Sequence, residues 1–239
     1  MRRFLGLCGA IGVIFWMVNA LRERGDEGWK NRGGGLESRV FSWNGARIHA
    51  FRAKASRVEV ASGAYLEAPA WLRREKARVA INGGYFDGRG HSMGLRVSRK
   101  FQSSDLRRAD WGVFWVKNGR AQITHTRDFK TKIRPEEALQ CGPRLVVKGK
   151  ITDLKPQSSR RSGVGIDARG RVVLAVADGA LSLTDWAQVW ASNDGLSCRD
   201  ALNLDGGPSS QLASDAKNRH QSDEDVTGGW PVPDALVIR

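Results

Sequence analysis

One short stretch of this 239-residue chain combines the residue types of a ligand-binding turn. An apolar run over residues 201–204 predicts a strand, and it leads directly into Asp205, Gly206, Gly207, Pro208, Ser209 and Ser210. Glycine tolerates positive φ and lets main-chain N–H groups approach a ligand, so such a turn can form a concave anion-binding nest. Asp205 would add a charge, and Ser209 and Ser210 would add hydrogen-bond donors. Asp-Gly-Gly on its own also fits an ordinary Asx turn after a strand.

Further polar turns follow apolar runs along the chain. In order they are Ile81 to Asp87, Cys141 to Leu145, Arg161 to Asp167 and Asp178-Gly179. Together with residues 201–210, this order resembles the phosphodiester glycosidase family from about Arg78 to the C-terminus, where residues 231–236 look like the closing strand of the family. The Ala-Leu-Asn-Leu-Asp-Gly-Gly-x-Ser-Ser run is the most specific part. Pro208 departs from the pattern, because a small residue usually follows the two glycines.

The resemblance implies an enzyme that hydrolyses a sugar 1-phosphodiester in an envelope glycan or related glycoconjugate. Glycosidases generally use two carboxylates, whose separation decides between inversion and retention. We predict Asp178 and Asp205 as this pair; which of them is nucleophile or base, and the stereochemical outcome, stay open. Arg161 is predicted to neutralise the phosphate, because a guanidinium matches phosphate oxygens in a bidentate way and keeps its charge at working pH.

Substrate binding is predicted at the polar turns. Asn82 and Asn203 would hydrogen-bond sugar hydroxyls or hold the carboxylates. Close approach of the substrate would be allowed by Gly83, Gly84, Gly206 and Gly207, and a further hydrogen-bond donor would come from Ser209. The sequence requires no cofactor, and a divalent cation at the two aspartates stays an open alternative, because clustered aspartates often share a metal with phosphate ligands. The chain has no Gly-x-Ser-x-Gly elbow, phosphate loop or His-Glu-x-x-His motif.

A second hypothesis uses the same residues without catalysis. A non-catalytic protein that binds a phosphoglycan, or that assists polysaccharide assembly, would need Arg161 and the glycine turns but not the charge of Asp205. Loss of that charge would leave binding intact, whereas it would remove transition-state stabilisation from an enzyme. The two hypotheses therefore differ in their response to Asp205→Asn.

The elements that must position these residues are mainly short strands. Asn44-Gly45 and Asn118-Gly119 lie between β-type runs and predict hairpins. Residues 69–76 and 183–192 predict helices, the second with a capping box formed by Ser182 and Asp185. A strand over 171–177, this second helix and a strand over 201–204 predict a β-α-β unit with parallel strands. We therefore predict an α+β fold with a mixed, hairpin-rich β-sheet core and a few helices.

The N-terminal segment indicates export. Residues 4–21 are almost uninterrupted apolar residues behind Arg2 and Arg3, which fits a signal peptide or an N-terminal membrane anchor over residues 1–21. The glycine-rich and charged residues 22–38 are predicted to form a flexible linker, and residues 39–239 the phosphodiester glycosidase-like domain. The expected location is periplasmic or extracytoplasmic, with membrane contact through residues 1–21 if they are not removed.

Charge and cysteine content add few constraints. The formal net charge is +14, and an anionic partner such as a phosphorylated sugar or glycan would match it. The basic residues lack the aromatic interleaving of a nucleic-acid platform, so no nucleic-acid partner is expected. Outside the apolar N-terminal segment the chain has two cysteines, Cys141 and Cys198. They could form a disulfide or remain two buried thiols, and both alternatives stay open. Their spacing is not that of a metal site.

Overall fold

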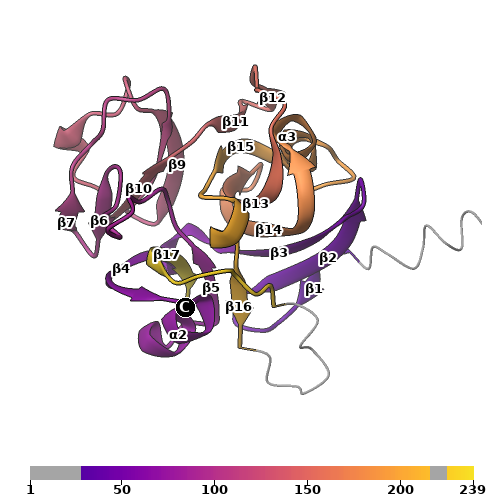
Figure 1. The fold of residues 1–239 in the computed structure, drawn as a ribbon, viewed down its shortest axis with the longest axis horizontal. Coiled ribbons are helices and arrows are strands. Elements are labelled where there is room, and N and C mark those ends of the chain that lie inside the picture. The colour runs from indigo at the N-terminus through magenta and orange to yellow at the C-terminus, as the bar shows by residue number, and fades with distance from the viewer. Residues whose placement is uncertain (1–27, 216–224) are drawn as a thin grey trace, which may run out of the picture.

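The structure is a computed structural model that describes residues 28–215 and 225–239. This part of the chain forms three β-sheets with α-helices on their outer faces (Figure 1), and the predicted α+β class is confirmed. The helices are α2 (Ala68–Glu75) and α3 (Leu183–Ala191). Single 3-10 turns occur at η1 (Ala55–Arg57), η2 (Thr131–Ile133) and η3 (Gly207–Ser209).

The largest sheet has eight strands and is antiparallel at every pairing that the described residues make. Its strands, in spatial order, are β1 (Lys30–Asn31), β2 (Glu37–Trp43), β3 (Ala46–Lys54), β14 (Arg171–Ser182), β13 (Ser158–Asp167), β15 (Cys198–Asn203), β11 (Arg144–Val147) and β12 (Lys150–Ile151).

The other two sheets face it from one side. A five-stranded sheet contains β7 (Phe101–Ser104), β6 (Arg96–Ser98), β10 (Glu137–Cys141), β8 (Gly112–Lys117) and β9 (Arg120–His125). A four-stranded sheet contains β16 (Leu212–Ser214), β5 (Val79–Asn82), β17 (Val232–Ile238) and β4 (Val58–Leu66).

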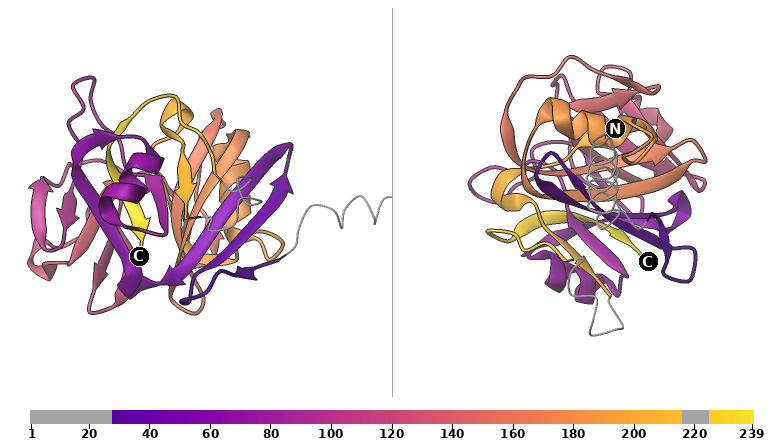
Figure 2. Two further views of the ribbon diagram at one scale, coloured as in Figure 1. Left: turned by 90° about the horizontal axis from the view of Figure 1, so that it is seen from below. Right: turned by 90° about the vertical axis from the view of Figure 1, so that its right-hand side faces the viewer.

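The main core lies where the three sheets meet. Val176 and Leu202 of the eight-stranded sheet pack in one buried cluster with Ile81 and Leu236 of the four-stranded sheet and with Phe114 of the five-stranded sheet. A second cluster covers the opposite face of the eight-stranded sheet under α3, and a third lies between the four-stranded sheet and α2. Figure 2 shows α2 beside β17 in its left view. Burial of these faces is the main source of stability for such layers.

Helix α3 and its neighbours follow local sequence signals. The Ser182 hydroxyl accepts a hydrogen bond from the Asp185 N–H at 3.0 Å, so the predicted cap is present. The helix buries Trp186 and Trp190 against the sheet. A Cβ on Gly163 or Gly165 would lie 2.7 or 2.6 Å from the Trp190 ring, so these glycines of β13 make room for the indole. The hairpins at Asn44-Gly45 and Asn118-Gly119 are confirmed.

The strands around α3 differ in part from the prediction. β14 and β15 are not neighbours: β13 lies between them and is antiparallel to both, so the two strands run in the same direction. β14 was expected to end at Ala177, but it continues to Ser182. Asp178 therefore lies within the strand, opposite Arg47 of β3. The ladder continues because Gly179 passes close to Ala46, where a Cβ would come within 2.9 Å.

The N-terminal part of the described chain already belongs to the fold. β1 pairs with β2 across a turn that contains Gly33 to Gly35, so pairing begins at Lys30 within the predicted linker. The predicted signal peptide or anchor, residues 1–21, lies outside the described residues. Within residues 28–215 and 225–239, no helix is long and apolar enough to cross a membrane. Cys141 and Cys198 are buried free thiols in different clusters.

Candidate active site

The site is built where two glycine turns meet. The N–H of Asp205 donates to the carbonyl of Gly83 at 3.2 Å, and the Asn82 side-chain amide donates to the carbonyl of Asp205 at 2.8 Å. The Asn82 oxygen accepts the Ser162 hydroxyl at 2.7 Å and the N–H of Gln211 at 3.2 Å. Asn82 is 1% exposed and its hydrogen bonds go to the protein, so it holds the Asp205 turn against β5 and β13.

The Asp205 carboxylate lies partly buried at this junction. Burial raises its pKa, and hydrogen bonds from the Ser209 hydroxyl and the Gly206 N–H oppose that change. The Gly206 N–H donates to Oδ1 at 3.0 Å. The charge of Asp234 raises the same pKa further. A carboxylate with a raised pKa is a stronger base than an ordinary aspartate, which suits Asp205 to accept a proton.

Ser209 connects Asp205 to the chain that precedes β17. It is 1% exposed on η3, and its hydroxyl accepts a hydrogen bond from the Trp230 indole N–H at 3.0 Å. The indole therefore orients the hydroxyl that donates to Asp205. Trp230 is 45% exposed, and sequence reasoning missed it because nothing in the local sequence ties it to the Asp205 turn.

Arg161 lies on β13 with its guanidinium buried. Its Nε donates to the carbonyl of Leu181 at 3.1 Å, and a second nitrogen donates to the carbonyl of Gln157. Burial lowers its pKa. Among the residues that the structure describes, no carboxylate forms an ion pair with Arg161. Its positive charge is therefore held by neutral carbonyls only, which leaves it able to attract an anionic ligand.

Tyr85 places Asp205 and Arg161 in one neighbourhood. Burial raises the pKa of its phenol, the charges of Cys141 and Asp205 raise it further, and Arg161 lowers it. Its hydroxyl donates to the carbonyl of Gly142. Arg161 also lies beside the Asp205 turn, because one of its nitrogens is 3.9 Å from where a Cβ on Gly206 would sit. Tyr85 follows the predicted Asn-Gly-Gly turn, but no pattern in the sequence distinguishes it as a site residue.

Asn203 adds a buried amide next to these groups. Its amide nitrogen donates to the carbonyls of Gly142 and Leu204 at 3.1 and 2.6 Å. Its Oδ1 is buried, and a hydrogen bond between the Asn203 side chain and the Tyr85 phenol lowers the pKa of that phenol. Asn203 therefore lies beside Tyr85 in the candidate site. It stays a candidate for contact with a substrate hydroxyl.

The predicted carboxylate partner, Asp178, lies apart from these contacts. Its side chain is 55% exposed and forms an ion pair with Arg160 at 3.2 Å. Arg160 also donates to the carbonyl of Thr227 at 2.9 Å, and its own carbonyl lies 2.9 Å from where a Cβ on Gly206 would sit. No hydrogen bond joins Asp178 to Asp205 in the described part of the chain. Its catalytic role stays a prediction.

Packing within the protein accounts for the glycines of the first turn. A Cβ on Gly83 would lie 1.9 Å from the Asp234 carboxylate, and one on Gly84 would lie 2.3 Å from the Arg96 guanidinium. Asp234 and Arg96 form a fully buried ion pair at 2.7 Å. The Gly84 N–H also donates to Asp234 at 2.9 Å. In the second turn, Gly207 has a φ of +59°, which favours glycine.

The described residues do not form a metal-binding cluster of side chains. Within residues 28–215 and 225–239, no group of three or more His, Cys, Asp or Glu side chains could hold a metal ion. Asp178 and Asp205 therefore do not lie in such a cluster.

Comparisons with known proteins point to one family. The model of the phosphodiester glycosidase family matches residues 75–239. The zebrafish N-acetylglucosamine-1-phosphodiester alpha-N-acetylglucosaminidase catalytic domain, in a structure auto-inhibited by its pro-peptide, is similar with a TM-score of 0.71 and 19% identity over 88% of this chain and 85% of that one. A hypothetical protein from Synechocystis has a TM-score of 0.60 and 14% identity over 88% of this chain and 63% of that one. A search of curated proteins found no match. The family model spans well over half of the sequence, and the chain therefore belongs to the phosphodiester glycosidase family.

Proposed function

We propose that this protein hydrolyses the bond between an anomeric carbon and a phosphate in a sugar 1-phosphodiester. Family membership supports a glycosidase-like function. The observation that carries the proposal is that Arg161, a guanidinium without a carboxylate partner among the described residues, has a nitrogen 3.9 Å from where a Cβ on Gly206 would sit, next to the carboxylate of Asp205. A phosphodiester-linked sugar needs a group of each kind, one at its anomeric carbon and one at its phosphate.

The reaction can be written with these two groups. Asp205 accepts a proton from water while the water oxygen bonds to the anomeric carbon. The bond from that carbon to the phosphate oxygen breaks, and the phosphate monoester leaves with the electron pair. Arg161 stabilises the charge that develops on the leaving phosphate. A phosphate monoester is a weak base, so its departure needs less proton donation than that of an alcohol.

The substrate and the location extend this proposal. The zebrafish relative is named for an N-acetylglucosamine 1-phosphodiester, which makes diesters of this sugar the first compounds to test. The apolar residues 4–21 behind Arg2 and Arg3 support export and a substrate in an envelope glycan. The net charge of +14 would favour encounter with such an anionic glycan.

The test is release of sugar from a panel of sugar 1-phosphodiesters by the purified protein. We expect Asp205→Asn to lower kcat by at least about 10³-fold while substrate binding persists, because the change removes the base but keeps the shape of the side chain. Arg161→Lys should raise KM and lower kcat, because lysine cannot form the bidentate contact. Asp178→Asn tests the other predicted carboxylate in the same assay. Substrate binding without turnover by the wild type would instead support a phosphoglycan-binding protein.

A further inference from the structure

A continuous row of main chain leads from Asp205 across the four-stranded sheet. The Asp205 N–H donates to Gly83, and the Gly83 N–H donates to the carbonyl of Asp234 at 2.9 Å. Asp234 in turn pairs with Ser62 of β4. Three steps between neighbouring chains, at about 4.8 Å each, place Ser62 of β4 roughly 14 Å from Asp205. Figure 1 shows β5, β17 and β4 in this succession.

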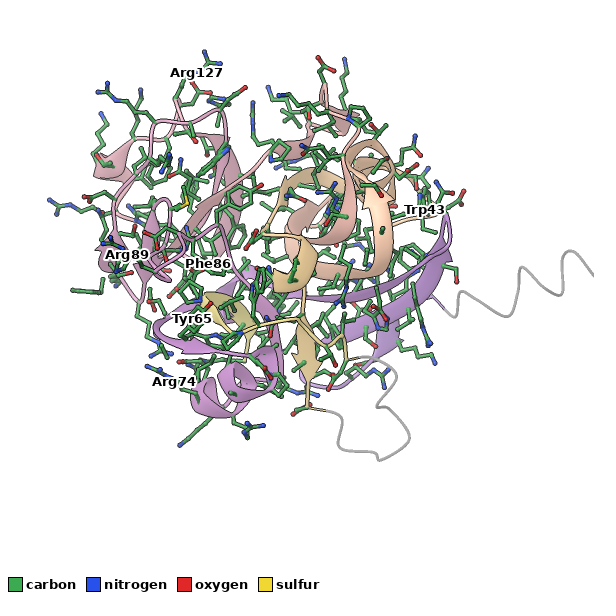
Figure 3. The ribbon with its side chains drawn as sticks, viewed as in Figure 1. Trp43, Tyr65, Arg74, Phe86, Arg89 and Arg127 are labelled. Atoms are coloured by element: carbon green, nitrogen blue, oxygen red, sulfur yellow. The ribbon has the colours of Figure 1, made fainter. Side chains whose placement is uncertain are left out.

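A pocket of about 580 Å³ opens at the far end of this row. It lies between the end of β4, the loop of residues 88–92, the end of β7 and Pro233. Its most prominent apolar group is Tyr65, which is 50% exposed and packs edge-on against Phe86 with ring centroids 6.0 Å apart. Figure 3 shows Tyr65, Phe86 and Arg89 on the same side of the molecule. The rest of the lining is mainly serine and glycine, with Arg89 and His91 at the loop.

The loop that forms one wall is held in place by its own hydrogen bonds. Asp87 accepts the N–H groups of Arg89 and His91, each at 2.9 Å, and its N–H donates to the His91 carbonyl at 2.9 Å. Ser92 donates to Asp234 at 2.6 Å, and Ser104 donates to the Ser92 carbonyl at 3.2 Å. A wall fixed in this way costs little ordering entropy when a ligand binds.

These features match the chemistry of a sugar ring. A pyranose has an apolar face of C–H groups that packs on an aromatic ring, and hydroxyls at its rim that need donors and acceptors. Tyr65 offers the ring. Ser62, Ser103 and Ser104 offer hydroxyl groups, and the guanidinium of Arg89 offers further donors. Among the described residues, Arg89 is the one arginine of the lining, and His91 lies 3.2 Å from the Asp87 carboxylate.

We propose that this pocket, defined by Tyr65, Arg89 and Ser104, binds a neutral sugar unit of the substrate at a distance from the bond that is cleaved. The inference rests on the proposed function and narrows its substrate class: the natural substrate is an extended glycan that has one sugar unit in this pocket and its scissile bond at Asp205. A substrate with one sugar would occupy the site at Asp205 alone.

The test separates binding at the pocket from catalysis. Isothermal titration and NMR would follow neutral chitooligosaccharides and maltooligosaccharides added to the wild type, Tyr65→Ala, Tyr65→Phe and a matched control, Phe101→Ala. Phe101 is 72% exposed on β7 but does not line the pocket. We expect Tyr65→Ala to weaken oligosaccharide binding roughly tenfold, while Tyr65→Phe and Phe101→Ala bind as the wild type does.

Kinetics supply the second readout. With an oligosaccharide 1-phosphodiester, Tyr65→Ala should raise KM roughly tenfold with kcat unchanged, and with a single-sugar diester both constants should stay at the wild-type values. Equal effects of Tyr65→Ala and Phe101→Ala, or no preference of the wild type for the longer compounds, would overturn the inference and leave the proposed function intact. Tyr65-dependent oligosaccharide binding by a protein inactive on every diester would support the pocket while the proposed function fails.

Discussion

The side-chain amide of Asn82 donates to the main-chain carbonyl of Asp205 at 2.8 Å, so the end of β5 holds the turn that carries the candidate base. The same amide accepts hydrogen bonds from Ser162 and Gln211. One buried side chain therefore joins the eight-stranded sheet, the four-stranded sheet and the segment after η3. The position of the Asp205 carboxylate therefore depends on contacts between the sheets as well as on the conformation of its own loop.

Asn82→Ala should lower both stability and activity. The substitution leaves the Ser162 hydroxyl, the Gln211 N–H and the Asp205 carbonyl without their partner, and an unsatisfied buried group costs about 1–3 kcal/mol. We expect a loss of roughly 3 kcal/mol in the free energy of unfolding, measured by urea denaturation. The control is Ser210→Ala, because the Ser210 hydroxyl is buried without a partner and its removal should cost nothing. Equal losses in the two variants would contradict the role given to Asn82.

Ser209→Ala should shift the pH dependence of hydrolysis. The Ser209 hydroxyl donates to Asp205 and lowers the pKa of that carboxyl, so its removal raises the pKa. A base must be unprotonated to act, so the rise of kcat/KM with pH should move to higher pH. Trp230→Phe removes only the indole donor to Ser209 and should shift the profile less. If the pH profile of kcat/KM is unchanged in Ser209→Ala, a group other than Asp205 controls the rise of kcat/KM with pH.

Local signals in the sequence predicted local structure well. Asn44-Gly45 and Asn118-Gly119 have positive φ at both residues, as two-residue hairpin turns require, and the Ser182 cap starts α3. These features depend on neighbouring residues only. The same kind of signal failed at Asp178-Gly179, because Asp-Gly is typical of a turn, whereas Gly179 here provides close contact between β14 and Ala46.

Contacts between distant segments could not be read from the sequence. Asp234 was noted only as part of the closing strand, yet it pairs with Arg96, accepts the N–H of Gly84 and raises the pKa of Asp205. Trp230 likewise reaches Ser209 from another segment. The pairing of strands decides these contacts, and no spacing within one segment encodes that pairing.

Gly83→Ala should destabilise the fold, because the new Cβ would lie 1.9 Å from the Asp234 carboxylate, which is fixed by Arg96. Overpacking of this kind typically costs about 1–3 kcal/mol, and displacement of a buried ion pair adds to it. The matched control is Gly88→Ala in the same loop region, where nothing lies within 4 Å of the new atom. Thermal unfolding of both variants measures the difference, and a similar melting temperature for the two would argue against the packing role of Gly83.

Glu137 on β10 should make the folded protein less stable as the pH rises, whereas a carboxylate paired with a cation at the surface has the opposite effect. Burial raises its pKa from 4.5 to about 7, although its oxygens accept the N–H groups of Val60 and Arg99 at 2.7 and 2.9 Å. The folded protein then binds more protons than the unfolded chain between these two values, so this contribution is complete below pH 4.5 and is lost as the pH rises through about 7. A shift of this size corresponds to a contribution on the order of 3 kcal/mol.

Other groups titrate in the same range, so the measurement is a comparison of two proteins. Burial raises the pKa of Asp205 as well, whereas hydrogen bonds from arginines keep the pKa values of Glu37 and Glu59 low. Glu137→Gln removes only the contribution of Glu137. We expect the wild type to exceed Glu137→Gln in unfolding free energy at pH 5 by more than at pH 8, as determined from urea titrations at each pH. A difference that stays constant over this interval would mean that Glu137 titrates in the folded protein as it does in the unfolded chain.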